Sequence, residues 1–488
     1  MVSDSLQVGD AFAQGYDTLL ATNPGWTELD EWPRSRLYKD GRRTTASQIL
    51  PARAFADGMA TATGPRIARS QIEGKKPAYL LGALRALDEV CLATADASQP
   101  PDPAWIDMRS HFRRTGRLND LTDGLVIPGR TQSAAPTVQH ESLASVFHTL
   151  RVCQEVADKF TWIHVDILFD YPPGVDVLSI AQVPMATVDD VERTVASTAS
   201  GAPMYILTPV DALASRVTSA RAAMGGYDLG LTAEATITET TLARWMHSPP
   251  HDAPTWILVG TGPIESWASP GGTAVSADPL DGGVPVPLNR GVLLHGRTGA
   301  IIAVADKTRG YTLGSEKELR DFQLPTSVLP RGEAMRPGKQ LVVLESNAGR
   351  FCILICEDLA RIVEYGSDLR SFGVTHVLNP VVAPPLIGYR WQHNRGQLLN
   401  SEVGTRLITG NSLAVRRFVK LGDDGHVVEE GDQTNPTLTG TIGPAPTLLV
   451  VGGYGTFDLV ANPSAMTQSP SEDATTVRAA EVDTAHLR

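Results

Sequence analysis

Cys356 is the residue in this sequence with the clearest capacity for covalent chemistry. The apolar segment FCILI leads directly into it, and Glu357 and Asp358 then begin a segment with apolar residues at helical spacing. A thiol at a strand-to-helix turn is held rigidly, and a helix N-terminus favours negative charge, so we expect a lowered pKa for this thiol. Cysteine is a strong nucleophile near neutral pH, but it needs a base and a cation to act well.

The alternative is that Cys356 is an inert core residue, since free cysteines are among the most buried residue types. We assign that structural role to Cys352, which lies in the middle of the same apolar segment. The chain has four cysteines, too few for a disulfide framework. Without a Cys/His cluster at ligand spacing, the sequence also predicts no zinc or other metal site.

The segments around Cys356 predict a layered α/β fold. From about 174 to 420, short β-rich segments recur between Gly, Pro and Asn, and several are almost entirely apolar, as in strands buried on both faces. Segments with helical spacing fall between some of them, as in 187–199 and 357–373. Alternating strands and helices are typical of layered α/β folds. The expected strands are VDVLSIAQV, MYILTPV, TWILVG, RGVLLHG, AIIAVADK, QLVVLES, RFCILIC, THVLNPVV and RLITGNSLAV.

The chain divides into three parts. Residues 1–170 are rich in predicted helix and loop, with helical spacing in 77–96 and 141–160, and they carry no catalytic signature. We interpret them as an accessory domain of unknown role. Residues 171–461 form the domain that contains Cys356, and 462–488 are predicted to be a mobile polar tail.

Composition excludes several classes of partner. The net charge is -12 and no stripe of Lys and Arg occurs, so nucleic acid is not expected to bind. No apolar run approaches the roughly 20 residues that span a bilayer. The first residues have neither a basic start nor an apolar core, so we expect no secretory signal and a cytoplasmic location.

The segment GRFCILICEDLAR resembles the cysteine motif of the nitrilase superfamily of carbon–nitrogen hydrolases. It is most similar to the motif in the glutaminase domains of glutamine-dependent NAD synthetases. The resemblance covers about 174–420 and implies an α/β fold, a four-layer αββα sandwich, here with a helix-rich N-terminal extension. It also implies pairing of two such sandwiches, hence a homo-oligomer. A complete NAD synthetase is excluded because the S-G-G-x-D-S loop that binds ATP does not occur.

The family carries a glutamate and then a lysine upstream of its cysteine, and both have counterparts here. In YDLGLTAEATITE, Glu234 takes the glutamate position, with Ala233 where the family has proline. In LNRGVLLHGRTGAIIAVADKTRGY, Asn289 and Lys307 match the family's hairpin and its lysine. The spacing from Lys307 to Cys356 is long for the family, which indicates an insertion at 324–338.

The resemblance implies further site residues. Many members have a second glutamate after the lysine, and Glu318 fits that place best, with Glu316 as the rival. The backbone N–H of Glu357 is expected to help bind the oxyanion. Asn379 and Pro380, in THVLNPVV, match the family's strand that ends in Asn-Pro and are expected to contribute to the substrate site.

Together these residues imply a hydrolase of non-peptide carbon–nitrogen bonds. Glu234 would accept the thiol proton of Cys356, the sulfur would attack a small-molecule amide, ureido or nitrile carbon, and Lys307 would stabilise the oxyanion. Ammonia or an amine would leave, and neither a metal nor an organic cofactor is required. Two alternatives remain: a catalytically weak binding or regulatory module of the same fold, or an N-acyltransferase. The family's membrane-bound acyltransferases have spanning helices that this sequence lacks.

Overall fold

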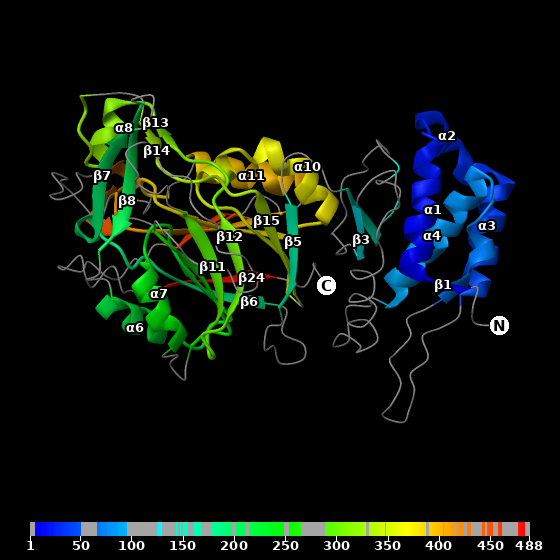
Figure 1. Cartoon of the computed structure of the whole chain (residues 1–488), viewed down its shortest axis with the longest axis horizontal. Helices are drawn as coiled ribbons and strands as arrows, with labels where there is room; N and C mark the ends of the chain where they lie inside the picture. Colours follow the sequence, from blue (N-terminus) through cyan, green and yellow to red (C-terminus); the bar gives the residue numbers. More distant parts are fainter. Residues whose placement is uncertain are drawn as a thin grey trace.

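The computed structural model (Figure 1) describes most of the chain. The described residues are 5–49, 66–94, 124–128, 143, 147, 150–154, 161–167, 177–197, 202–210, 214–247, 253–262, 264, 288–327, 331–346, 348–386, 390–403, 405–415, 418–423, 427–430, 442–444, 447–451, 457–460 and 477–483.

Two large mixed sheets surround the main core. The six-stranded sheet has the order β12-β11-β10-β9-β6-β24, and the seven-stranded sheet has the order β23-β22-β18-β17-β16-β15-β5. The first comprises β6 (Val177–Val183), β9 (Leu229–Thr232), β10 (Trp256–Gly260), β11 (Arg290–His295), β12 (Ile301–Asp306) and β24 (Arg478–Asp483). The second comprises β5 (Thr161–Asp166), β15 (Gln340–Ser346), β16 (Gly349–Ile353), β17 (His376–Val381), β18 (Arg406–Asn411), β22 (Leu448–Val451) and β23 (Phe457–Val460).

The nearly continuous apolar strands are explained by burial of both faces. In β10, Trp256 and Leu258 enter the core shared by the two sheets. Ile257 and Val259, which alternate with them, enter a second core beneath the helices of the outer layer. Because successive side chains of a strand point to opposite faces, a strand covered on both sides is apolar at every position.

Helices cover the outer face of each sheet and complete four layers (Figure 1). On the six-stranded sheet, α6 (Ala214–Ala223) and α7 (Glu239–His247) pack through buried residues such as Leu242 and Trp245. On the seven-stranded sheet lie α9 (Glu357–Ala360), α10 (Ile362–Phe372) and α11 (Trp391–Val403). The predicted αββα sandwich is therefore confirmed, as is the helical segment 357–373. The predicted strands are also confirmed, although MYILTPV forms a strand outside the two large sheets.

A small sheet lies beside the sandwich, in the order β13-β14-β8-β7. Its elements are β7 (Val191–Ser197), β8 (Pro203–Pro209), β13 (Thr312–Leu313) and β14 (Arg331–Glu333), with α8 (Glu316–Asp321) next to β13 in the chain. The helix predicted for 187–199 is wrong, because this segment forms a short 3-10 helix, η4 (Val188–Asp190), and then β7. Pairing of β7 with β8 along seven residues decides the conformation of a segment rich in Val and Thr.

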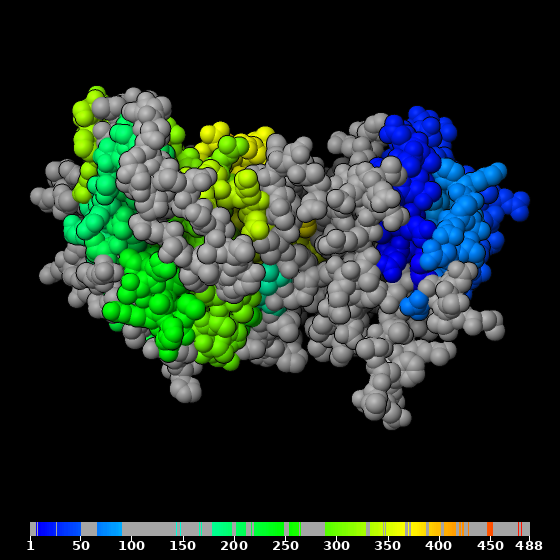
Figure 2. Space-filling view, viewed as in Figure 1, coloured from blue at the N-terminus to red at the C-terminus, as the bar shows by residue number. Residues whose placement is uncertain are grey.

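A separate helical core lies in the N-terminal part. Its helices α3 and α4 cross so closely that a methyl group on Gly41 would meet the Tyr79 carbonyl oxygen at 2.2 Å. Figure 2 shows the surface of these helices in blue at one end of the molecule. The elements are β1 (Ser5–Gln7), α1 (Val8–Ala21), α2 (Trp26–Glu31), η1 (Trp32–Arg34), α3 (Arg36–Gln48), β2 (Arg66–Ala68), η2 (Arg69–Gln71) and α4 (Pro77–Thr94).

The helix predicted over 77–96 corresponds to α4. The helix predicted over 141–160 is wrong where β4 (Leu150–Gln154) pairs with β3 (Gly124–Pro128).

A three-stranded sheet joins β19 (Phe418–Leu421), β20 (Val427–Glu430) and β21 (Ile442–Pro444). In the described residues, none of the helices is long and apolar enough to cross a membrane.

The sandwich extends beyond the predicted limits of 171–461 at both ends. Strand β5, in the range assigned to the accessory domain, pairs in parallel with β15. Strand β24 pairs with β6 along six residues, so the predicted tail at 462–488 is not mobile throughout. Backbone pairing with the sheet edge fixes this segment, and Ala480 packs against the core between the two sheets.

Gly260, at the end of β10, allows the backbone before Glu234 to pass close by. A methyl group on Gly260 would meet the Ala233 carbonyl oxygen at 2.1 Å and the Glu234 Cα at 2.7 Å. We expect Gly260→Ala to lower the free energy of unfolding by at least about 1–3 kcal/mol, the usual cost of overpacking, in denaturant titrations. Gly366→Ala is the matched control, since it lies in α10 with no atom within 4 Å of the added methyl. It should raise stability by up to about 1 kcal/mol, and equal effects of the two changes would contradict the packing argument.

Candidate active site

The three residues predicted to do chemistry follow the ends of three strands. Glu234 comes two residues after β9, Lys307 directly after β12, and Cys356 three residues after β16. All three are buried, with 4%, 1% and 8% of their surface exposed, respectively. Groups at the carboxyl ends of strands gather at one edge of an α/β structure, where ligands commonly bind.

The three side chains meet through hydrogen bonds. The Lys307 Nζ donates to Glu234 Oε1 at 2.7 Å, and the thiol of Cys356 is hydrogen-bonded to the Glu234 carboxylate. Glu234 is held by two further donors: the Asn289 Nδ2 at 2.7 Å from Oε1, and the backbone N–H of Val382 at 3.1 Å from Oε2. A carboxylate fixed by four partners keeps one orientation towards the thiol.

Glu234 lies in a tight turn after β9, and this turn places its side chain in the site. Ala233, at the position where the resemblance implies proline, accepts a hydrogen bond at its carbonyl oxygen from the Thr236 hydroxyl, at 2.7 Å. Ala235 has a φ of 51°, in the left-handed region that is costly for a residue with a side chain. Hydrogen bonds from this turn to the end of β10 hold it there: Ala235 N–H to the Thr261 carbonyl oxygen and Thr236 N–H to that of Gly260. The turn keeps its shape without proline.

Cys356 also has a strained backbone, with φ 46° and ψ −105°. Its N–H donates to the Pro380 carbonyl oxygen at 3.0 Å, which ties the turn to the end of β17. Strain of this kind persists only where surrounding contacts fix it, and it clusters at active sites. The conformation presents the sulfur to Glu234 and places the backbone of Glu357 at the start of α9.

The pKa of the Cys356 thiol is shifted in the direction opposite to the prediction. Burial, reinforced by the nearby carboxylate of Glu234, raises the pKa of the Cys356 thiol well above its ordinary value, although Lys307 acts in the opposite direction. The predicted lowering of this pKa is therefore wrong, because desolvation in the sandwich outweighs a helix of only four residues. A raised pKa keeps the resting thiol protonated, beside the carboxylate that can accept its proton.

Lys307 remains an ammonium ion in this buried place. Burial alone would lower its pKa, but the carboxylates of Glu234 and Glu333 outweigh that effect and hold the pKa well above its ordinary value. The Lys307 Nζ donates to Glu333 Oε2 at 2.6 Å, and Asn289 Nδ2 bridges to Glu333 Oε1 at 3.0 Å. Glu333, on β14, thus shares both donors, Lys307 and Asn289, with Glu234.

Glu318, predicted as the second glutamate, and its rival Glu316 have their described contacts away from Lys307. Glu318 caps α8 through the N–H groups of Gly314 and Ser315, and it accepts a hydrogen bond from the Tyr311 hydroxyl at 2.6 Å. Glu316 forms an exposed ion pair with Arg320. Glu333 was missed because it lies in 324–338, which we had interpreted as an insertion, and only the pairing of β14 with β8 brings it to the site.

The three residues predicted for oxyanion and substrate binding all lie beside the cysteine turn. Asn379 is fully buried in β17, and its Nδ2 donates to the Leu354 carbonyl oxygen at 2.5 Å. Pro380 contributes the carbonyl oxygen that binds the Cys356 N–H. The Glu357 side chain turns away to Arg361, at 3.0 Å. Asn379 and Pro380 therefore position the turn, and a role for any of the three in substrate binding stays a prediction.

Asp358 links the lysine to the cysteine and was not singled out from the sequence. Its carboxylate accepts from the Thr308 N–H at 3.0 Å, the Thr308 hydroxyl at 2.6 Å, the Arg309 N–H at 3.0 Å and the Ile355 N–H at 3.1 Å. The first three donors directly follow Lys307, and the last precedes Cys356 by one residue. One buried carboxylate thus fixes the distance between the two turns. Burial raises its pKa to about 7, opposed mainly by the hydrogen bond from Thr308 and the charge of Lys307.

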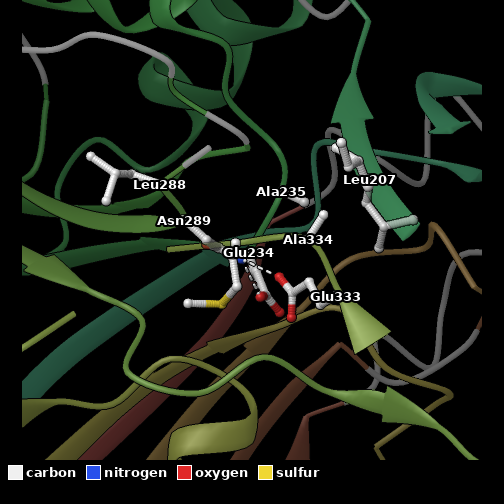
Figure 3. Close-up of a pocket in the computed structure, with 9 residues that line it drawn as sticks. Leu207, Glu234, Ala235, Leu288, Asn289, Glu333 and Ala334 are labelled. Atoms are coloured by element: carbon white, nitrogen blue, oxygen red, sulfur yellow. Dashed lines mark hydrogen bonds between the residues drawn. The ribbon is translucent and has the colours of Figure 1, made fainter. Parts of the chain in front are cut away.

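A small pocket opens onto this cluster (Figure 3). Glu234, Glu333 and Asn289 meet at its polar side, while Leu207 and Leu288 lie on opposite sides of them. The remaining lining residues are Ile206, Ala235, Ala334 and Met335. Within the described part of the chain, no group of three or more His, Cys, Asp or Glu could hold a metal ion.

Two stacked sheets between helical layers, with a glutamate, a lysine and a cysteine meeting at strand ends, are the arrangement that the sequence resemblance implies. The chain has a nitrilase-like fold. The sandwich and the order of its elements carry this assignment, and the prediction of the fold is confirmed.

Comparison with solved structures finds similar proteins. They include a glutamine-dependent NAD+ synthetase from Acinetobacter baumannii (14% identity, TM-score 0.35, covering 63% of this chain and 46% of that one). An amidase from Nesterenkonia sp. matches at 17% identity and TM-score 0.29, over 56% and 89% of the two chains. The C. elegans NitFhit protein matches at 15% identity and TM-score 0.37, over 64% and 62%. Neither a protein-family model nor a curated protein matches the chain.

The match spans less than half of the NAD+ synthetase, and all three TM-scores are below 0.5. These likenesses therefore say nothing of the activity or substrate of the nitrilase-like sandwich described here.

Glu333 and Glu318 give a direct test of which carboxylate serves Lys307. We expect Glu333→Gln to lower kcat by about 100-fold, the typical effect of removing a fixed charge from a catalytic cluster. Glu318→Gln should leave kcat nearly unchanged and cost about 1 kcal/mol of stability, because it weakens a helix cap. Kinetics and thermal unfolding of both variants would measure this, and a larger loss of kcat in Glu318→Gln would contradict the assignment.

Asp358 predicts an acid limb in the pH profile. Its raised pKa means that the carboxyl gains a proton as the pH falls through about 7 and then binds the N–H groups of Thr308 and Arg309 less well. We expect kcat to fall below about pH 7 in the wild type, and Asp358→Asn to have lower kcat without that limb. Glu364→Gln, which changes a neighbouring, partly exposed carboxyl, should keep it. An unchanged limb in Asp358→Asn would assign the titration to another group.

Proposed function

We propose that this protein hydrolyses non-peptide carbon–nitrogen bonds of small molecules through a covalent intermediate on Cys356. One observation carries the proposal: a thiol, a carboxylate and an ammonium group are joined by hydrogen bonds in one buried cluster at the edge of a pocket. Each group is the type that acyl transfer through sulfur requires, namely a nucleophile, a proton carrier and an oxyanion partner.

The first half of the reaction forms a thioester. Glu234 accepts the thiol proton as the Cys356 sulfur attacks the carbonyl carbon of an amide or ureido group. Negative charge develops on the carbonyl oxygen and is stabilised by the Lys307 ammonium and by the backbone N–H of Glu357. Glu234 then gives the proton to the leaving nitrogen, the carbon–nitrogen bond breaks, and ammonia or an amine departs.

The second half regenerates the enzyme. Glu234, again ionised, accepts a proton from a water molecule, and the hydroxide attacks the thioester carbon. The carbon–sulfur bond breaks, the carboxylic acid leaves, and the sulfur recovers its proton from Glu234. A nitrile would reach the same thioester by a longer route: the sulfur adds to its carbon to give a thioimidate, one water adds to that carbon, and ammonia leaves. The raised pKa of the thiol suits this scheme, because the proton stays on sulfur until Glu234 receives it during attack.

The pair of buried cysteines supplies a matched test. Cys356→Ala should abolish ammonia release from a panel of small amides, ureido compounds and nitriles, because the nucleophile is removed. Cys352→Ala should keep activity, since Cys352 is a fully buried core residue on β16, and it should mainly lower stability.

Mass spectrometry of the intact protein, quenched during turnover, should show the acyl group on the wild type and on Cys352→Ala alone. Full-rate ammonia release by a pure Cys356→Ala variant would exclude the proposed function.

A further inference from the structure

The pocket beside the catalytic cluster has two chemically distinct sides. Glu234 belongs to both the cluster and the pocket wall, so the pocket adjoins the cluster in which Cys356 lies. Away from the carboxylates the wall is apolar, formed by Ile206, Leu207, Leu288 and Met335. The space between these side chains is narrow, so only a small group fits against them.

The charges at the polar side of the pocket are unbalanced. The carboxylates of Glu234 and Glu333 share the single ammonium of Lys307, at 2.7 and 2.6 Å. With the Cys356 thiol protonated, one negative charge is left in excess. Among the described residues that line the pocket, no Lys, Arg or His offers a partner to a substrate anion.

From these features we propose that the substrate carries a small, uncharged and mainly apolar acyl group, and that acyl groups bearing a carboxylate are rejected. This inference rests on the proposed function and specifies its substrate class. An apolar group gains by leaving water for the Leu and Met side chains. A carboxylate in the same place loses its hydration, finds no cation, and is repelled by the excess charge on Glu234 and Glu333.

Two amides of equal shape test the proposal on the wild-type enzyme. In 4-methylpentanamide an isopropyl group occupies the place that the carboxylate occupies in succinamate, so the pair differs in charge and hardly in size. We expect kcat/KM for ammonia release to be higher for 4-methylpentanamide by on the order of 100-fold, since a like charge close to a buried anion is strongly disfavoured. Equal rates, or faster release from succinamate, would overturn the inference.

A substitution on β8 tests the cause of the preference. Leu207 lines the pocket and is only partly buried, so a longer polar side chain can be accommodated there. Leu207→Arg should shift the ratio of kcat/KM towards succinamate by at least about tenfold, because a cation now pairs with the carboxylate. Leu207→Met, which keeps an apolar wall, should retain the wild-type ratio. An identical shift in both variants would show that shape, not charge, decides, and would contradict the proposal.

The outcomes also separate this inference from the proposed function. Turnover of succinamate alone, dependent on Cys356, would refute the apolar acyl group and leave the hydrolase intact. Ammonia release from neither amide, while other amides or nitriles are hydrolysed in a Cys356-dependent way, would refute it as well. Absence of Cys356-dependent ammonia release from every compound in the panel would remove the proposed function itself.

Discussion

The buried ammonium of Lys307 is the interaction on which the site depends. It lies between two carboxylates that would repel each other without it, in a place where an unpaired ion is very costly. Removing one partner of such a buried cluster typically costs about 3–5 kcal/mol, because the remaining charges lose their compensation. The same arrangement orients Glu234 towards Cys356. The contacts of Lys307 with the two carboxylates therefore stabilise the fold and also position the groups for the reaction.

Around this ammonium, the two sheets hold turns whose backbone conformations do not occur in helices or strands. Glu234 and Cys356 both lie in turns with backbone conformations that most residues avoid, and each turn is fixed by hydrogen bonds to a neighbouring strand end. Asp358 connects two of these turns through donors on Thr308, Arg309 and Ile355. The strain is local, and the buried sheets on either side support it.

The features that could be predicted from the sequence are those that a short segment determines by itself. Strands buried on both faces have a plain apolar pattern, and the segment around Cys356 combines such a strand with a helix start. Lys307 and Glu234 followed from the order of similar segments, and the structure brings both to the cysteine. Ser315 and Glu318 form a capping box, a local motif that could have shown that Glu318 was already engaged in its own helix.

Glu333 could not be found in this way, because its place depends on β14 pairing with β8, which is distant in the chain. The pKa of the thiol escaped prediction for a similar reason, since desolvation depends on the whole sandwich. The segment 187–199 was predicted as a helix although its Val and Thr residues suit the strand that pairing with β8 selects.

The two strands at the limits of the sandwich have a consequence for folding. Strand β24 lies against β6, so the edge of the six-stranded sheet closes between segments separated by nearly 300 positions in the chain. Contacts of such long sequence separation raise the contact order and slow the search for the native pairing. The entropy of closing a long loop grows only with the logarithm of its length, so the equilibrium cost is modest. During synthesis the edge of β6 stays unpaired until β24 has been made, and until then it can pair with a wrong neighbour.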